Sequence, residues 1–206
     1  MATSPRLVVA TGNPHKVEEI RSILTPYFSE AVLAGIAPLG QFTREEPVED
    51  GVTFEANSLI KARAACRLTG LPALADDSGI TVDVLGGAPG VFSARWCGHH
   101  GDDRANRELL LAQLADVPDQ HRGCAFVACV TLVLPDGREF ATEGRVKGHL
   151  ARQSSGSGGF GYDPIFVPDG FSVTTAQLSP AEKNALSHRG QAVRLMVEHL
   201  QELLGD

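Results

Sequence analysis

The hydrophobic and polar positions at the start of the chain have periods that predict a strand followed by a helix. The segment from Arg6 to Ala10, apolar after its first residue, is typical of a buried strand. The pair Asn13-Pro14 suits the cap and first turn of a helix. Val17, Ile20 and Leu24 then fall on one face of that helix, which we expect to pack on the core.

The middle of the chain predicts a short strand, a long helix and two further strands, at residues 31–33, 53–69, 72–75 and 80–85. A loop rich in Gly, Pro and Glu is expected from Ala34 to about Gly51, between the strand at 31–33 and the long helix. Gly70 ends the helix as its C′ residue. The residues from Asp76 to Gly79 are turn formers, so we expect an acidic turn between the last two strands.

The remaining elements predicted are a helix at 102–115, a β-hairpin of 124–134 with 139–146, a glycine-rich loop at 153–161 and a final helix at 191–204. Residues Ser179 to Glu182 form a capping box with proline at the first helical position. Helices and strands interleave, while the hairpin adds antiparallel pairing. We therefore predict an α/β fold with an elongated, mixed central sheet flanked by helices.

Length and composition favour one globular enzyme domain. The chain has 206 residues, of which 43% are hydrophobic and 21% are charged, so a single domain over residues 1–206 is expected. No apolar run approaches the roughly 20 residues of a membrane helix, and the start of the chain lacks the pattern of a signal peptide. We expect a cytoplasmic protein without membrane contact, in which the four cysteines are free thiols.

The formal net charge limits the partners that the protein can bind. It is −7 at pH 7, which argues against binding to nucleic acid or to an acidic membrane surface. A small polyanion remains possible, provided that basic side chains, backbone N–H groups or a metal ion are concentrated at one place.

The adjacent carboxylates Asp76 and Asp77 are the first candidates for chemistry. Neighbouring anionic side chains repel, and a divalent cation relieves that repulsion because hard cations take oxygen ligands. The alternative is a structural turn in which the Asp and Ser side chains hydrogen-bond their own backbone.

A second candidate is the segment that joins the first strand to the first helix. Such a turn presents free N–H groups at the positive end of the helix dipole, where phosphate binds readily. Lys16 adds a positive charge, and Thr11 or Asn13 can donate to a phosphate oxygen. Simple capping of the helix by Asn13 is the alternative.

Glycines and cations near the end of the chain supply further candidates. Residues 156–161 match Gly-x-Gly-x-x-Gly, but no helix follows, so a dinucleotide-binding turn is rejected. Phe160 and Tyr162 offer stacking surfaces for a ligand or, alternatively, anchors for packing. Arg189 has the donors for a carbonyl or phosphate, and Lys61 either faces solvent or reaches the carboxylates.

The order of these segments resembles one family, the ITP/XTP pyrophosphatases, which remove deaminated purine nucleoside triphosphates. The motifs that carry the resemblance are Thr-Gly-Asn-x-x-Lys from Thr11, Thr-Phe-x-x-Asn-x-x-x-Lys-Ala from Thr53, Ala-Asp-Asp-Ser-Gly from Ala75, Gly-Gly-Phe-Gly-Tyr-Asp-Pro-Ile-Phe from Gly158 and Ser-His-Arg-Gly from Ser187. The resemblance implies two lobes that share one sheet, an active-site cleft between the lobes, and a homodimer. It also implies Mg²⁺, at least one ion per subunit, and hydrolysis of ITP, dITP and XTP to the monophosphate and pyrophosphate.

The resemblance also implies a role for each matching residue. Asp77 matches the catalytic and metal-binding carboxylate, and Glu49 falls where the family has a second acidic metal ligand. The substrate contacts implied are Thr11, Gly12, Asn13, Pro14, His15, Lys16, Lys61, Ser78, Phe160, Gly161, Tyr162, Asp163, Lys183, His188 and Arg189.

The mechanism expected from these residues is in-line attack of water on the α-phosphorus, with Asp76 or Asp77 orienting or deprotonating the water. Donors from Arg189 and the backbone would pair with a 6-oxo purine and reject the 6-amino group of adenine. Two other functions stay open: a pyrophosphatase for other modified nucleotides, and a purine nucleotide-binding module without turnover.

Overall fold

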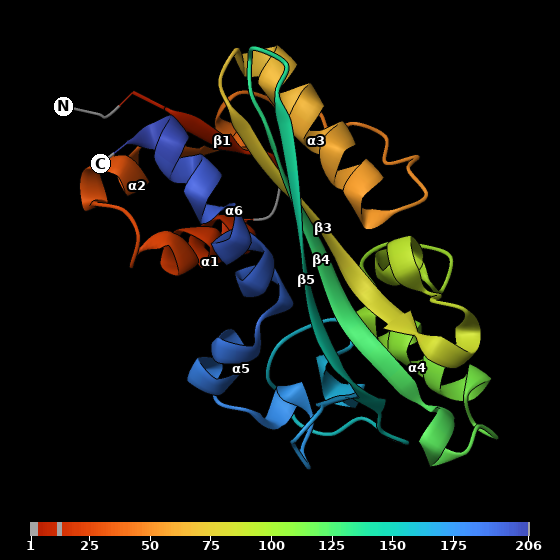
Figure 1. Cartoon of the computed structure of the whole chain (residues 1–206). Helices are drawn as coiled ribbons and strands as arrows, with labels where there is room; N and C mark the ends of the chain where they lie inside the picture. The colour runs from red at the N-terminus through yellow and green to blue at the C-terminus, as the bar shows by residue number, and fades with distance from the viewer. Residues whose placement is uncertain (1–3, 12–13, 206) are drawn as a thin grey trace. The chain divides into compact units, whose positions relative to one another are not determined.

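The computed structural model describes residues 4–11 and 14–205. Within this part of the chain, six strands form one sheet in the order β2-β1-β3-β4-β5-β6 (Figure 1). The strands are β1 (Leu7–Val9), β2 (Ile36–Pro38), β3 (Ala73–Val82), β4 (Gly123–Val133), β5 (Glu139–Leu150) and β6 (Phe166–Pro168). Strand β1 pairs in parallel with β2 and β3, whereas β5 and β6 are antiparallel. The predicted mixed α/β fold is confirmed.

The helices that flank the sheet are α1 (Pro14–Leu24), α2 (Glu30–Ala34), α3 (Phe54–Thr69), α4 (Asp103–Gln113), α5 (Pro180–Leu186) and α6 (His188–Leu204). In the described residues no helix is both long and apolar enough to cross a membrane. The predicted capping box at α5 is present, and α6 begins at His188 rather than at residue 191.

Contacts divide the chain into two compact units. Unit 1 comprises Met1–Asp77, Ala128–Gly144 and Arg189–Asp206, and unit 2 comprises Ser78–Val127 and Arg145–His188. Strands β3, β4 and β5 each supply residues to both units.

The core of unit 1 has a helix layer on each face of the sheet. Leu7 and Val9 pack with buried residues of α1 and α6, while Val8 and Ala10 pack with buried residues of α3. Figure 1 shows α3 on one side of these strands and α1 with α6 on the other. This division follows from the strand period of two, because successive side chains point to opposite faces.

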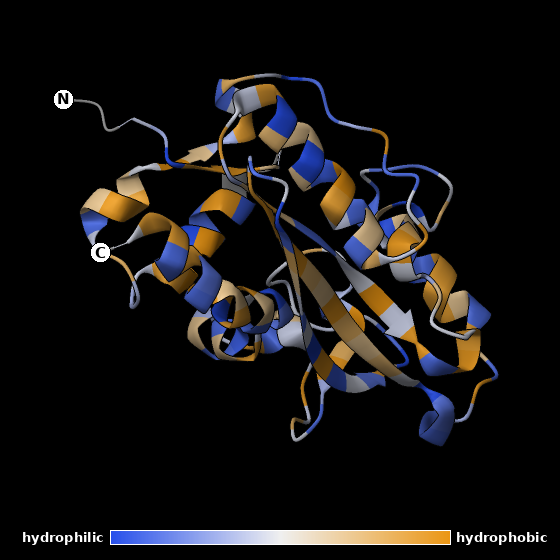
Figure 2. Ribbon diagram, turned by 45° about the horizontal axis from the view of Figure 1, so that its top comes forward, coloured by the Kyte–Doolittle hydropathy of each residue, from blue (hydrophilic) through white to orange (hydrophobic). Residues whose placement is uncertain are grey.

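Helix α3 forms as the sequence predicts. The Thr53 hydroxyl accepts a hydrogen bond from the Ala56 N–H at 3.1 Å, and Gly70 ends the helix in the left-handed region at φ 67°. Figure 2 shows hydrophilic and hydrophobic residues alternating along this helix, as expected for an element with one buried face.

The prediction of a strand at residues 31–33 is wrong. These residues belong to α2, and strand β2 lies a few positions later, inside the segment predicted as a loop. The run of small and apolar residues fits either period over so short a length, and alanine and leucine favour the helix. Gly35 closes α2 through its N–H, which donates to the Val32 carbonyl at 2.9 Å.

The prediction of an acidic turn is also wrong, because Asp76 and Asp77 lie inside the continuous strand β3. The glycine that favoured a turn has a different role here. A Cβ on Gly79 would overlap the Ser93 hydroxyl oxygen, which itself accepts a hydrogen bond from the Ile80 N–H at 2.9 Å. Gly79 therefore lets another segment approach the strand closely.

Arg122 bonds two other segments of unit 2 and is almost fully buried, with 2% of its surface exposed. Its guanidinium donates to the carbonyls of Leu114 at 2.6 Å, Leu150 at 2.9 Å and Ala151 at 2.9 Å. The end of α4 is thereby tied to the end of β5, where the glycine-rich loop begins.

We expect Arg122→Met to lower the free energy of unfolding by about 2–4 kcal/mol, since it leaves three carbonyl acceptors without their donors. Urea unfolding followed by circular dichroism measures this. Arg152→Met is the matched control, because Arg152 also bonds carbonyls but its side chain is 53% exposed. The free energy of unfolding should fall less in this variant. Equal losses in the two variants would contradict the role given to Arg122.

Candidate functional site

The two adjacent aspartates point to opposite faces of β3. Asp76 faces α1 and α6, where Lys16 and Arg189 contact it, and Asp77 faces α3, where Lys61 contacts it. The strand period separates two carboxylates that a turn would bring together. Each is matched by its own cations, so their mutual repulsion is not the feature that defines the site.

Asp76 is buried and ionised. Lys16 Nζ lies 3.1 Å from each of its carboxylate oxygens, and Arg189 Nε donates to it at 2.9 Å. Burial alone would raise the pKa of Asp76, but the charges of Arg189, Lys16 and Lys61 outweigh it and hold that pKa well below the usual range.

Arg189 is bound on both sides by carboxylates. Besides Asp76, its Nη1 donates to Glu19 at 2.6 Å, and its side chain is 4% exposed. Burial lowers the pKa of Arg189, but the attraction of Asp76 and Glu19 prevails and raises it overall. The structure thus gives this guanidinium two protein partners, and the predicted contact with a purine base stays a prediction.

Asp77 belongs to a different cluster, which contains a second acid. Lys61 Nζ lies 3.3 Å from an oxygen of Asp77 and 3.3 Å from an oxygen of Glu49. Asn57 Nδ2 donates to the other oxygen of Asp77 at 3.3 Å. Burial raises the pKa of Asp77, Lys61 opposes this shift and Glu49 adds to it, so the pKa is raised overall.

Glu49 and Asp77 present the oxygen ligands that a hard divalent cation takes, and both already approach one positive charge. In the part of the chain that the structure describes, no group of three or more His, Cys, Asp or Glu side chains is placed to hold a metal. Two carboxylates suit a hard divalent cation that takes its other ligands from water.

The glycine-rich loop of unit 2 carries a second group of predicted residues. The buried Asp163 carboxylate accepts hydrogen bonds from the Phe160 N–H at 2.8 Å, from the Thr175 hydroxyl at 2.9 Å and from Lys183. Lys183 Nζ also lies 5.1 Å from the centre of the Phe160 ring. Phe160 is 66% exposed, so a flat aromatic surface and a cation are presented together.

The remaining predicted residues have varied surroundings. Tyr162 is buried and donates its hydroxyl to the Ser93 carbonyl at 2.8 Å, which makes it a packing anchor rather than an open stacking surface. His188 stacks on Phe126 with ring centres 5.2 Å apart, and Ser78 lies half-buried in β3.

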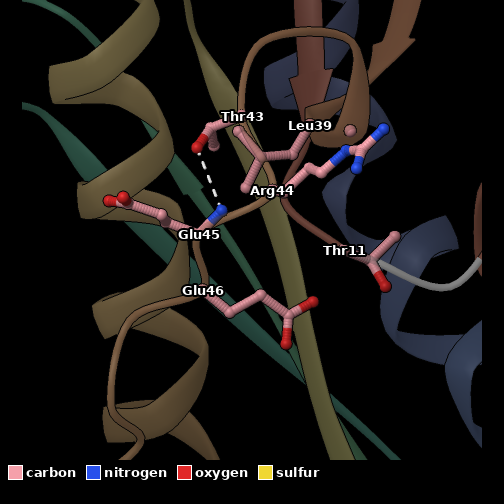
Figure 3. Close-up of a pocket in the computed structure, with 7 residues that line it drawn as sticks. Thr11, Leu39, Thr43, Arg44, Glu45 and Glu46 are labelled. Carbon is pink, nitrogen blue, oxygen red and sulfur yellow. Dashed lines mark hydrogen bonds between the residues drawn. The ribbon is translucent and has the colours of Figure 1, made fainter.

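The predicted phosphate turn is described only in part. Gly12 and Asn13 lie outside the described residues, and Pro14 and His15 open α1. Thr11 lines a cavity of about 300 Å³ together with Leu39, Gly40, Thr43, Arg44, Glu45 and Glu46 (Figure 3).

Two residues of the Asp76 and Asp77 clusters were not predicted. Asn57 lies one helical turn before Lys61 in the Thr-Phe-x-x-Asn-x-x-x-Lys-Ala motif, so its i,i+4 spacing could have placed it on the same face. Glu19 follows Lys16 by three positions in α1 and shares its face, but its partner Arg189 is remote in sequence.

The chain is thus a mixed α/β protein with a lysine–carboxylate cluster on each face of strand β3. The chain resembles the solved structure of a HAM1 protein from Coxiella burnetii at 38% identity, with a TM-score of 0.86 and coverage of 96% of this chain and 99% of that one. A nucleoside-triphosphatase / dITP/XTP pyrophosphatase from Mycobacterium abscessus is 48% identical, with a TM-score of 0.77 and coverage of 98% and 100%.

The chain belongs to the Ham1 family, whose model matches residues 7–199. A dITP/XTP pyrophosphatase from Streptomyces coelicolor is 52% identical over 200 residues, which cover 97% of this chain and 99% of the relative.

Proposed function

We propose that this protein hydrolyses the non-standard purine nucleotides ITP, dITP and XTP to the monophosphate and pyrophosphate, and so removes them from the nucleotide pool. The observation that carries the proposal is the cluster of Asp77, Glu49 and Lys61, which combines two carboxylates suited to a metal ion with a lysine cation suited to phosphate. Family membership and relatives named dITP/XTP pyrophosphatase support the same activity.

Asp77 and Glu49 would hold Mg²⁺, with phosphate oxygens and water as its other ligands. When bound, the ion neutralises phosphate charge and lowers the pKa of the attacking water. A chain with a net charge of −7 needs such local compensation to bind a triphosphate. Lys61 and the turn from Thr11 to Lys16 would add to this compensation of charge.

Asp77, rather than Asp76, is our choice for the group that accepts the proton of the water. Two cations, Lys16 and Arg189, contact Asp76 and hold its pKa well below the usual range, and its side chain is 1% exposed. The side chain of Asp77 is 15% exposed, so water can reach it.

The purine would stack on the exposed ring of Phe160, with Lys183 beside it. Stacking serves any purine, so the choice of a 6-oxo base needs hydrogen-bond donors. Backbone N–H groups and Arg189 remain the predicted donors. A domain of two lobes that share one sheet, a homodimer and a cytoplasmic location also remain predictions.

A panel of ITP, dITP, XTP, ATP, GTP and dUTP, with pyrophosphate as the measured product, tests the proposal. We expect ITP, dITP and XTP to be preferred over ATP by at least about 10²-fold in kcat/KM, and EDTA to abolish turnover until Mg²⁺ is restored. Preference for another modified nucleotide would favour the alternative pyrophosphatase. Tight binding of ITP without any product would favour the binding module.

A further inference from the structure

The backbone around Phe160 is held from several sides although its ring is exposed. The Phe160 N–H is bound by Asp163, and the next residue but one, Tyr162, is anchored through its hydroxyl to Ser93. An exposed aromatic side chain on a restrained backbone is prepared to bind before a ligand arrives, because little conformational freedom is lost on binding.

The peptide groups of Gly161, between these two anchors, are bound by a helix that carries none of the family motifs quoted above. The Gly161 N–H donates to Asp103 Oδ2 at 2.7 Å, and the Gly161 carbonyl accepts from Arg107 Nη1 at 2.6 Å. Asp103 and Arg107 are four positions apart in α4 and therefore lie on one helix face. One residue of the loop is thus bound at both its donor and its acceptor.

The charges of the two side chains suit this arrangement. Asp103 lies in the first turn of α4, where the helix dipole stabilises a carboxylate, and a carboxylate binds an N–H more strongly than a neutral acceptor does. Arg107 supplies the matching cation to the carbonyl. Gly161 has φ 56°, a left-handed conformation that the two contacts help to maintain.

We propose that Asp103 and Arg107 are positioning residues, which fix the Gly161 peptide so that Phe160 presents its ring to the purine base. The inference rests on the proposed function, since it assigns Phe160 to the base. It differs from that function in naming two α4 residues that need not touch the nucleotide. Loss of either contact should weaken binding of the base and leave binding of the triphosphate tail unchanged.

The test compares Asp103→Ala and Arg107→Met with the wild-type protein. The matched controls are Arg104→Met and Glu108→Ala, because Arg104 and Glu108 pair on the exposed surface of the same helix at 2.6 Å. Asp103→Asn retains an oxygen acceptor for the Gly161 N–H and is the conservative variant. Steady-state kinetics with dITP and inhibition by inorganic tripolyphosphate, which has no base, are measured for each.

We expect KM for dITP to rise about five- to tenfold in Asp103→Ala and in Arg107→Met, with kcat changed less than about threefold. The inhibition constant of tripolyphosphate should stay within about twofold of the wild-type value. Asp103→Asn should recover most of the wild-type KM, and the two controls should match the wild type. Should Asp103→Ala fail to fold, Arg107→Met and Asp103→Asn carry the test.

Unchanged KM values in active Asp103→Ala and Arg107→Met proteins would overturn the inference and leave the proposed function intact. A parallel rise in KM and in the tripolyphosphate constant would also overturn it, because the residues would then act on the whole fold. A wild-type protein that hydrolyses no triphosphate would instead refute the proposed function, and the inference with it.

Discussion

Asp77→Asn is expected to lower the turnover of ITP by at least about 10³-fold. The substitution keeps the shape of the side chain but removes the charge that would bind the cation and the basic oxygen that would accept a proton. Lys61 would keep Glu49 as its partner, so the lysine proposed to bind phosphate stays in place. The loss should therefore appear in kcat, measured as pyrophosphate released at saturating ITP and Mg²⁺.

The same substitution should leave the free energy of unfolding nearly unchanged. The pKa of Asp77 is raised, first through burial and further by Glu49, despite the attraction of Lys61. A raised pKa means that folding disfavours the ionised form at neutral pH, so removing that charge carries no electrostatic cost. Urea unfolding without added metal measures this.

Asp116→Asn, at an exposed aspartate of unit 2, is the control for both measurements. It should match the wild-type protein in turnover and in stability. Near-normal turnover in Asp77→Asn would remove Asp77 from the mechanism, while a large loss of stability would show that the residue is structural.

Sequence periodicity predicts most of the helices and strands correctly, but the prediction of a turn at the two aspartates was wrong. The helix ending at Gly70 and the β4–β5 hairpin have strong local signals, and both were predicted. The acidic turn was wrong because Asp, Ser and Gly favour turns locally, whereas strand β3 continues through them, supported by its neighbours β1 and β4. Local propensity carries no information about those neighbours.

The motifs named the residues of the site but not their partners. Lys61 and Asp77 were both predicted, and the structure brings them together. Arg189 is predicted to contact a purine because its guanidinium carries several donors, and the structure adds Asp76 and Glu19 as its protein partners. Such pairs join α1, β3 and α6, and only the three-dimensional fold places them.

Asp76→Asn is expected to lower the free energy of unfolding by about 3 kcal/mol or more. It breaks a buried ion pair from one side, and the amide that replaces the carboxylate leaves Lys16 and Arg189 without their shared anion. Because these two residues come from α1 and α6, the loss loosens the helix layer on that face of β3. Urea unfolding at pH 7 measures the difference.

The pH dependence of that difference gives a second check on Asp76. Burial opposes ionisation of Asp76, but Arg189 and Lys16 hold its folded-state pKa below the unfolded value. Its contribution is therefore present above the unfolded pKa of about 4 and is lost as the pH falls further. The stability gap between the wild type and Asp76→Asn should narrow below about pH 4, and a constant gap would contradict this assignment.

The comparison of Asp76→Asn with Asp77→Asn separates stability from chemistry at neighbouring positions. Both changes remove one negative charge and conserve side-chain volume, so their general effects on net charge and packing are the same. The two side chains differ in the face of β3 that each occupies and in the cations that each meets. Lost turnover with an intact fold at one position, and lost stability at the other, would trace the division of roles to the strand period of two.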